Sequence, residues 1–175
     1  MVVITIFGIM VAATYIPYSY YEIKQRVKIG GKQVSQILYE ARNMAINGQS
    51  DNNKNVSVGV FFDVENDKNK VVILTYPYTF TGSEIGTLET SEIKKIRTLE
   101  LPKWVQIETI WTQKKALFFF QSISWQGKFW WWDTTGTKSE FPAGVIELKL
   151  SFKWSTQTNL QKIIQYYTYT HIIDY

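Results

Sequence analysis

Cysteine is absent from the 175-residue chain, and histidine occurs once, as His171. The absence of cysteine excludes disulfides, thiolate metal sites and cysteine nucleophiles. A single imidazole without thiols disfavours a structural transition-metal site, so we interpret His171 as a polar residue on a strand face. The sequence also contains no P-loop and no GxSxG motif. We therefore expect no catalytic residues, no metal and no cofactor.

The overall composition is that of a folded protein. Hydrophobic residues make up 45% of the chain, charged residues 19% and aromatic residues 16%. The aromatic content favours strands. The net charge of +4 is mildly basic, which permits contact with nucleic acid or anionic lipid but is more simply a solubility charge. Four acidic residues near predicted turns lack calcium-loop spacing, and we interpret them as solvated: Asp51, Asp63, Glu65 and Asp67.

No charged residue occurs between Val2 and Tyr21. A helix of about twenty residues is about 30 Å long, which matches the hydrocarbon core of a bilayer. We therefore predict a membrane helix over residues 1–21, and four tyrosines near its end resemble an interfacial aromatic belt. A buried strand or core helix and a cleaved signal peptide are the alternatives. The residues assigned to the membrane helix are Val2, Val3, Ile4, Ile6, Phe7, Gly8, Ile9 and Pro17.

Residues 22–48 continue as an amphipathic helix, because apolar residues recur at helical spacing. This predicted packing face consists of Val27, Val34, Ile37, Leu38, Ala41 and Ala45. It packs against the sheet of the head or contacts neighbouring subunits, and both can hold, because the head does not cover the part nearest the membrane. Gly30 and Gly31 interrupt the pattern, and we predict a hinge or a local loss of helix there. Gly48 and the polar run 49–55 are expected to end the helix and form a loop.

Residues 49–175 are predicted to form a β-rich head. Alternating or apolar runs between turn signals predict about eight strands in an antiparallel meander or a pair of sheets. The predicted ranges are 56–63, 70–78, 92–101, 104–111, 115–124, 128–133, 144–154 and 162–173.

Three consecutive tryptophans, Trp130, Trp131 and Trp132, lie in one predicted strand. Alternate residues of a strand face opposite sides, so we expect one side to fill the core and the other to pack beneath a loop. The alternative is an exposed aromatic platform for a glycan, a partner subunit or a nucleic-acid base. The basic residues of the head that suit nucleic acid are dispersed among acids: Lys94, Lys95, Arg97, Lys103, Lys114 and Lys115.

Residues 1–48 resemble the N-terminal segment of type IV prepilins and of the pseudopilins of type II secretion. The resemblance rests on the run Val2–Met10, on Ala12, Ala13 and Pro17, and on the amphipathic continuation that ends in Glu40–Gly48. This last run is similar to minor pseudopilins of the GspH/FimT type. The resemblance implies a pilin-like α+β fold, in which a long N-terminal helix packs on an antiparallel head. The family's basic leader and docking glutamate have no counterpart in these residues.

The resemblance also implies a function, that of a structural filament subunit in a bacterial type IV pilus or type II secretion system. Its partners are other pilin or pseudopilin subunits and the inner membrane, crossed once, with the head in the periplasm or outside the cell. The basic residues after the apolar run favour the opposite orientation, a conflict that a basic leader before Met1 resolves. The alternative is a membrane-anchored β domain that binds a glycan or DNA. A tethered enzyme is a third hypothesis, without a motif to support it.

Overall fold

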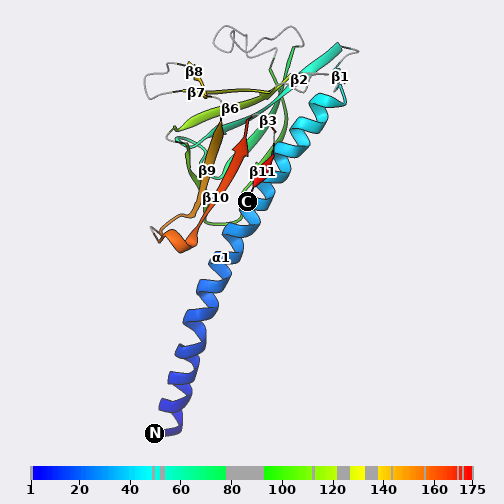
Figure 1. The fold of residues 1–175 in the computed structure, drawn as a ribbon. Coiled ribbons are helices and arrows are strands. Elements are labelled where there is room, and N and C mark those ends of the chain that lie inside the picture. Colours follow the sequence, from blue (N-terminus) through cyan, green and yellow to red (C-terminus); the bar gives the residue numbers. More distant parts are fainter. Residues whose placement is uncertain are drawn as a thin grey trace.

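The computed structural model describes residues 2–48, 50–51, 54–77, 93–111, 113–121, 127–132, 138–142, 144–155, 157–168, 170 and 172–174. Within these ranges the protein consists of one long helix, eleven strands and one short 3-10 turn. The helix runs along a head built from two antiparallel sheets, and its N-terminal half protrudes from the head (Figure 1). The predicted α+β class, with a long helix packed on antiparallel strands, is confirmed.

Helix α1 spans Val2–Ile46 without interruption and includes Pro17. At its end, the backbone N–H of Asn47 donates to the carbonyl of Asn43 at 2.9 Å. Gly48 follows with a φ of 68°, a left-handed conformation that glycine adopts without a Cβ clash. The helix therefore ends at the glycine that the sequence predicts.

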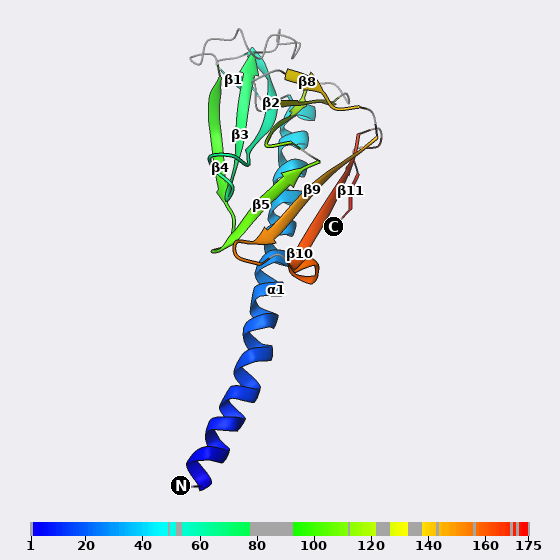
Figure 2. The ribbon, with the colours of Figure 1, turned by 90° about the vertical axis from the view of Figure 1, so that its left-hand side faces the viewer.

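The larger sheet contains β1 (Ser50–Asp51), β2 (Lys54–Asp63), β3 (Lys70–Pro77), β4 (Lys94–Glu100), β6 (Lys115–Phe120), β7 (Gly127–Trp132) and β8 (Lys138–Glu140). Its order is β4-β3-β2-β6-β7-β8, and β1 pairs with β2 off this path. The smaller sheet contains β5 (Val105–Ile110), β9 (Val145–Phe152), β10 (Gln161–Tyr167) and β11 (Ile173–Asp174), in the order β11-β10-β9-β5. The 3-10 turn η1 (Thr158–Leu160) precedes β10. In Figure 2, strands β5, β9 and β10 of the smaller sheet cross in front of α1, and strands β2, β3 and β4 of the larger sheet lie above them and to the left.

Two details of the predicted strands are wrong. The range 162–173 is not one strand, because the chain reverses after Tyr167 and Tyr166 pairs with Ile173 of β11. The polar run 49–55 is not only a loop, because Ser50 pairs with Asn55 in a short hairpin. The remaining predicted strands occur near their predicted positions, but strand β8 was not predicted. Of the two predicted arrangements, a meander and a pair of sheets, the structure has the pair of sheets.

The core lies where α1 meets both sheets. Phe118 of β6 is fully buried and makes edge-to-face contacts with Phe62, Phe129 and Tyr166 at centroid distances of 5.4, 5.3 and 5.2 Å. Because Tyr166 belongs to β10, Phe118 joins the two sheets. Helix α1 contacts strands of both sheets, among them β2, β9 and β10. The head and the second half of the helix therefore share one core.

The interruption predicted at Gly30 and Gly31 is wrong, because α1 is continuous there and both residues are buried. A Cβ on Gly30 would lie 3.0 Å from Cγ1 of Val105 and 3.5 Å from Cδ2 of Leu150. A Cβ on Gly31 would lie 3.3 Å from Cγ of Lys162. The two glycines therefore allow α1 to approach the smaller sheet closely, at the expense of intrinsic helix stability.

Replacing Gly30 with leucine is expected to destabilise the head by about 2 kcal/mol, because the added side chain has to displace Val105 and Leu150. Gly8→Leu is the matched control, since a Cβ at Gly8 has nothing within 4 Å. This control is expected to leave the unfolding midpoint of the head unchanged. Urea unfolding followed by tryptophan fluorescence measures both variants. Equal midpoints for Gly30→Leu and the wild type would show that α1 does not pack this closely.

Candidate functional site

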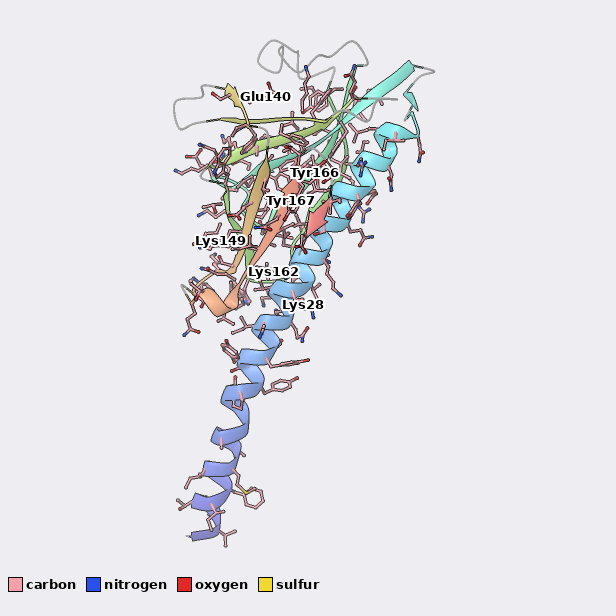
Figure 3. The ribbon with its side chains drawn as sticks, viewed as in Figure 1. Lys28, Glu140, Lys149, Lys162, Tyr166 and Tyr167 are labelled. Carbon is pink, nitrogen blue, oxygen red and sulfur yellow. The ribbon has the colours of Figure 1, made fainter. Side chains whose placement is uncertain are left out.

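The protruding part of α1, residues 2–21, is here called the stalk. Its side chains project into the surroundings along its length (Figure 3). Seven of its aliphatic and phenylalanine side chains are exposed by 53% to 75%: Val3, Ile4, Ile6, Phe7, Ile9, Met10 and Val11. Among the described residues, no helix combines the length and apolarity needed to cross a membrane. Residues 3–11 of the stalk nevertheless expose a group of large apolar side chains, which soluble monomers rarely do.

The second half of α1 is fixed to the head. All six residues of the predicted packing face are buried, with 0–3% of their surface exposed. This face therefore contacts the head, and residues on the opposite side of this half of the helix, such as Lys32, Gln36 and Asn43, are exposed. Arg97 of β4 adds a polar contact, since its Nη1 lies 3.0 and 2.9 Å from the two carboxylate oxygens of Glu40.

Two tryptophans lie together at the end of the head from which the stalk emerges. The rings of Trp104 and Trp154 are 4.5 Å apart between centroids, and their exposed fractions are 38% and 68%. The ammonium group of Lys153 lies 5.9 Å and 5.4 Å from the two ring centroids. That of Lys103 lies 5.2 Å from the Trp104 ring. We call these four residues the base cluster.

The β5–β9 pairing assembles the base cluster. Val105 pairs with Phe152, and the backbone N–H of Lys153 donates to the carbonyl of Trp104 at 2.7 Å. Trp104 has a φ of 71°, a left-handed conformation that is strained for a bulky residue. Such strain persists only where the surroundings impose it, and it is common at functional sites.

A cleft of about 460 Å³ adjoins the base cluster. Its charged lining residues are Glu65, Lys68, Lys103 and Lys153. Glu65 already lies 3.9 and 3.8 Å from the ammonium groups of Lys114 and Lys115. The cleft therefore presents excess positive charge next to two exposed aromatic rings. Sequence reasoning missed this cluster, although the repeated Lys-Trp dipeptide at 103–104 and 153–154 is a signal for it.

The three consecutive tryptophans occupy β7, between β6 and β8. The side chains of Trp130, Trp131 and Trp132, and the whole of His171, lie outside the described residues. An exposed aromatic platform at this place therefore stays a prediction. The six basic residues considered for nucleic acid do not converge. Lys94, Lys95 and Arg97 lie on the edge strand β4, Lys103 is in the base cluster, and Lys114 and Lys115 face Asp63 and Glu65.

Asp63 organises the turn between β2 and β3. One carboxylate oxygen accepts the backbone N–H groups of Glu65 and Asn66, both at 3.0 Å. The other accepts Nδ2 of Asn66 at 2.9 Å and lies 3.7 Å from the ammonium group of Lys115. Burial acts to raise the pKa of Asp63, but these hydrogen bonds and Lys115 outweigh it, so the pKa lies below the ordinary value of 3.8. This acidic residue thus stabilises a turn.

The pKa of Asp63 predicts a loss of stability in acid. Because the folded pKa is lower than the unfolded one, the ionised side chain stabilises the protein above about pH 4, and this contribution disappears as the pH falls through the folded pKa. Asp63→Asn is expected to lower the free energy of unfolding at pH 7 by about 1 kcal/mol. The difference from the wild type should shrink below pH 4. Urea unfolding at several pH values measures this.

Asp67→Asn is the matched control. The Asp67 carboxylate lies 3.2 Å from Nζ of Lys70, and its side chain is 56% exposed. Removal of such a pair is expected to change stability by less than about 0.5 kcal/mol. A pH-independent difference between Asp63→Asn and the wild type would contradict the role assigned to the ionised carboxylate.

Two buried tyrosines have shifted pKa values. Burial raises the pKa of Tyr76 and Tyr166 above the ordinary value of 10, although Arg42 opposes the shift at Tyr166. Both phenols therefore stay protonated at neutral pH. General acid–base catalysis favours a group whose pKa lies near the working pH, which is not the case for these two tyrosines. In the part of the chain that the structure describes, no three histidine, aspartate or glutamate residues gather in a group that could hold a metal. The absence of enzyme activity and of a cofactor stays a prediction.

Comparisons with protein-family models, with curated proteins and with solved structures found no match for this chain.

Proposed function

We propose that this protein is a structural subunit, a minor pilin or pseudopilin, of a bacterial type IV pilus or type II secretion filament. The observation that carries the proposal is the apolar stalk, which continues directly into a helix half that is built into the core of the head. A helix that exposes this much apolar surface needs a cover, and equivalent helices of other subunits supply one. The sequence resemblance of residues 1–48 points to the same arrangement.

In this proposal the stalk has two successive environments. Before assembly we place it in the bacterial inner membrane as a single span, with the head in the periplasm or outside the cell. This placement follows from the sequence of residues 1–21, although no helix of the described residues meets the length and apolarity of a membrane span. In the filament, stalks of neighbouring subunits lie side by side and bury the same side chains. The absence of charge from Val2 to Tyr21 supports both environments, since one charged residue in either would be costly.

The head follows the stalk as one rigid unit in this proposal. The packing face of α1, the close approach at Gly30 and the pair between Arg97 and Glu40 tie the helix to the head. A force applied along the stalk is therefore transmitted to the sheets. This coupling is what a filament subunit needs, and it requires no catalytic group.

Site-directed cross-linking tests the proposal, and the absence of cysteine makes a single introduced thiol unique within the chain. Gly8→Cys places a thiol on the stalk at a position with open space around its Cβ. Native membranes and sheared filaments are oxidised. We expect a disulfide to form between the Gly8→Cys variant and a second copy of it, or another subunit that carries a cysteine at the corresponding position of its stalk. Lys95→Cys, on the exposed edge strand β4, is the control.

The two positions are compared at equal expression. Cross-linking at Gly8 well above that at Lys95, in a fraction that sediments with filaments, supports a stalk-packed subunit. The proposal is overturned if the chain does not sediment with filaments and the thiol at position 8 cross-links no more than the thiol at position 95. The membrane-anchored binding domain then becomes the leading hypothesis.

A further inference from the structure

The base cluster lies at the height where the stalk leaves the head. Nη1 of Arg26 is 3.5 Å from the carbonyl of Lys103, and a Cβ at Gly30 would lie 3.5 Å from Cδ of Pro102. These contacts fix the cluster beside the helical turns that follow the stalk. Lys28 on α1 and Lys162 on β10 lie at this same end of the head (Figure 3).

The stalk carries its own aromatic band just before this point. Tyr15, Tyr18, Tyr20 and Tyr21 are exposed, and Tyr21 precedes Arg26 by about 7 Å along the helix axis. The headgroup layer of a bilayer is about 5–7 Å thick on each side. If the tyrosines lie at the boundary of the hydrocarbon, Arg26 and the base cluster beside it lie at the outer edge of the headgroup layer.

The chemistry of the base cluster suits that layer. Tryptophan prefers the membrane interface, because its ring is apolar and its N–H is polar. Lysine places its ammonium group among anionic headgroups while its stem covers apolar surface. The adjoining cleft carries three lysines, and its one carboxylate, Glu65, is already close to Lys114 and Lys115. The electrostatics therefore favour an anionic partner.

We propose that the base cluster docks the head on the anionic phospholipid headgroups of the membrane that holds the stalk. This inference rests on the proposed function, because it requires the stalk to be inserted. Docking fixes the height and rotation of the head before assembly. When the subunit leaves the membrane, the contact has to break, so it opposes premature extraction.

A sugar fits the same observations less well. Stacking on a sugar needs an open aromatic face, whereas Trp104 has Trp154 and the ammonium groups of Lys103 and Lys153 against its ring. Two cations over the rings favour negative charge in the partner. The observations therefore favour a lipid surface, and another occupant is an outcome of the test below.

The experiment uses the full chain with one introduced cysteine, labelled with a fluorophore and reconstituted into vesicles. Gln157→Cys reports on the base, since Gln157 is exposed and follows Trp154 closely. Glu140→Cys, on β8 at the opposite end of the head (Figures 1 and 3), is the matched control. The vesicles contain either phosphatidylcholine alone or phosphatidylcholine with phosphatidylglycerol, plus a trace of lipid with a nitroxide on its headgroup. Flotation of the vesicles measures insertion, and quenching by the nitroxide measures docking.

We expect strong quenching at position 157 in the anionic vesicles and little at position 140. Changing Lys103 and Lys153 to glutamine should lower the ratio of docked to undocked heads about thirtyfold, as loss of two lysines near an anionic surface predicts. Lys95→Gln, on β4, is the charge-matched control and should leave the ratio unchanged. Flotation should be the same for every variant.

Four results overturn the proposal. A chain that does not float contradicts membrane insertion as well as this inference. A chain that floats, but is quenched no more at 157 than at 140, contradicts docking alone. Quenching at position 157 that is the same without anionic lipid contradicts recognition of anionic headgroups. Quenching that is unaffected by the lysine changes, and is lost only when other filament subunits are added, assigns the cluster to a different partner.

Discussion

Replacing Leu38 with aspartate is expected to unfold the head. Leu38 is 1% exposed and lies on the face of α1 that belongs to the common core. The change removes a buried side chain, which costs about 2–5 kcal/mol, and places a carboxylate where no water reaches it. The sum approaches the roughly 5–15 kcal/mol of total stability typical of a domain. Circular dichroism and tryptophan fluorescence of the purified variant measure the result.

Two further variants keep this prediction testable if Leu38→Asp gives no soluble protein. Leu38→Ala removes the same contacts without adding charge, and its urea midpoint is expected to fall by the equivalent of about 3 kcal/mol. Gln36→Asp adds the same charge two residues away, on the exposed side of α1, and should change stability by less than about 0.5 kcal/mol. A wild-type midpoint for Leu38→Ala would mean that this face of α1 does not form part of the core.

The periodic features of the chain could be predicted from sequence. Residues such as Val34, Leu38 and Ala41 recur at the spacing of one helix face, and helical geometry alone brings them together. The strands with clear alternation were predicted for the same reason. Such patterns are local, so they do not depend on which elements later become neighbours.

The features that sequence reasoning misread depend on contacts between distant segments. In the sequence, Gly30 and Gly31 indicate an interruption of the helix. In the structure they allow close packing of α1 against Val105 and Lys162, which lie far away in the chain. The pairing of Trp104 with Trp154 likewise exists only because β5 and β9 align. The reversal between β10 and β11 was missed because residues 168–170, Thr-Tyr-Thr, carry no glycine, proline or asparagine to mark a turn.

The stalk prediction separates folding from assembly. Phe7→Arg is expected to leave the unfolding midpoint of the head unchanged, because Phe7 is 68% exposed and lies on the protruding part of α1. The same change should lower incorporation into filaments roughly a hundredfold, since a buried arginine in an apolar helix environment costs about 2.5–3.5 kcal/mol. Co-sedimentation of the chain with sheared filaments measures incorporation, and thermal unfolding measures the head.

Phe7→Leu is the matched control, because it keeps an apolar side chain at the same place and should incorporate nearly as well as the wild type. Phe7→Arg and Leu38→Asp together separate assembly from folding. One charge in the second half of α1 should destroy the fold, whereas one charge in the stalk should destroy only assembly, because the head buries the first position and leaves the second exposed. If Phe7→Arg incorporates as well as Phe7→Leu, the apolar surface of the stalk is not buried in a filament, and the proposed function is wrong.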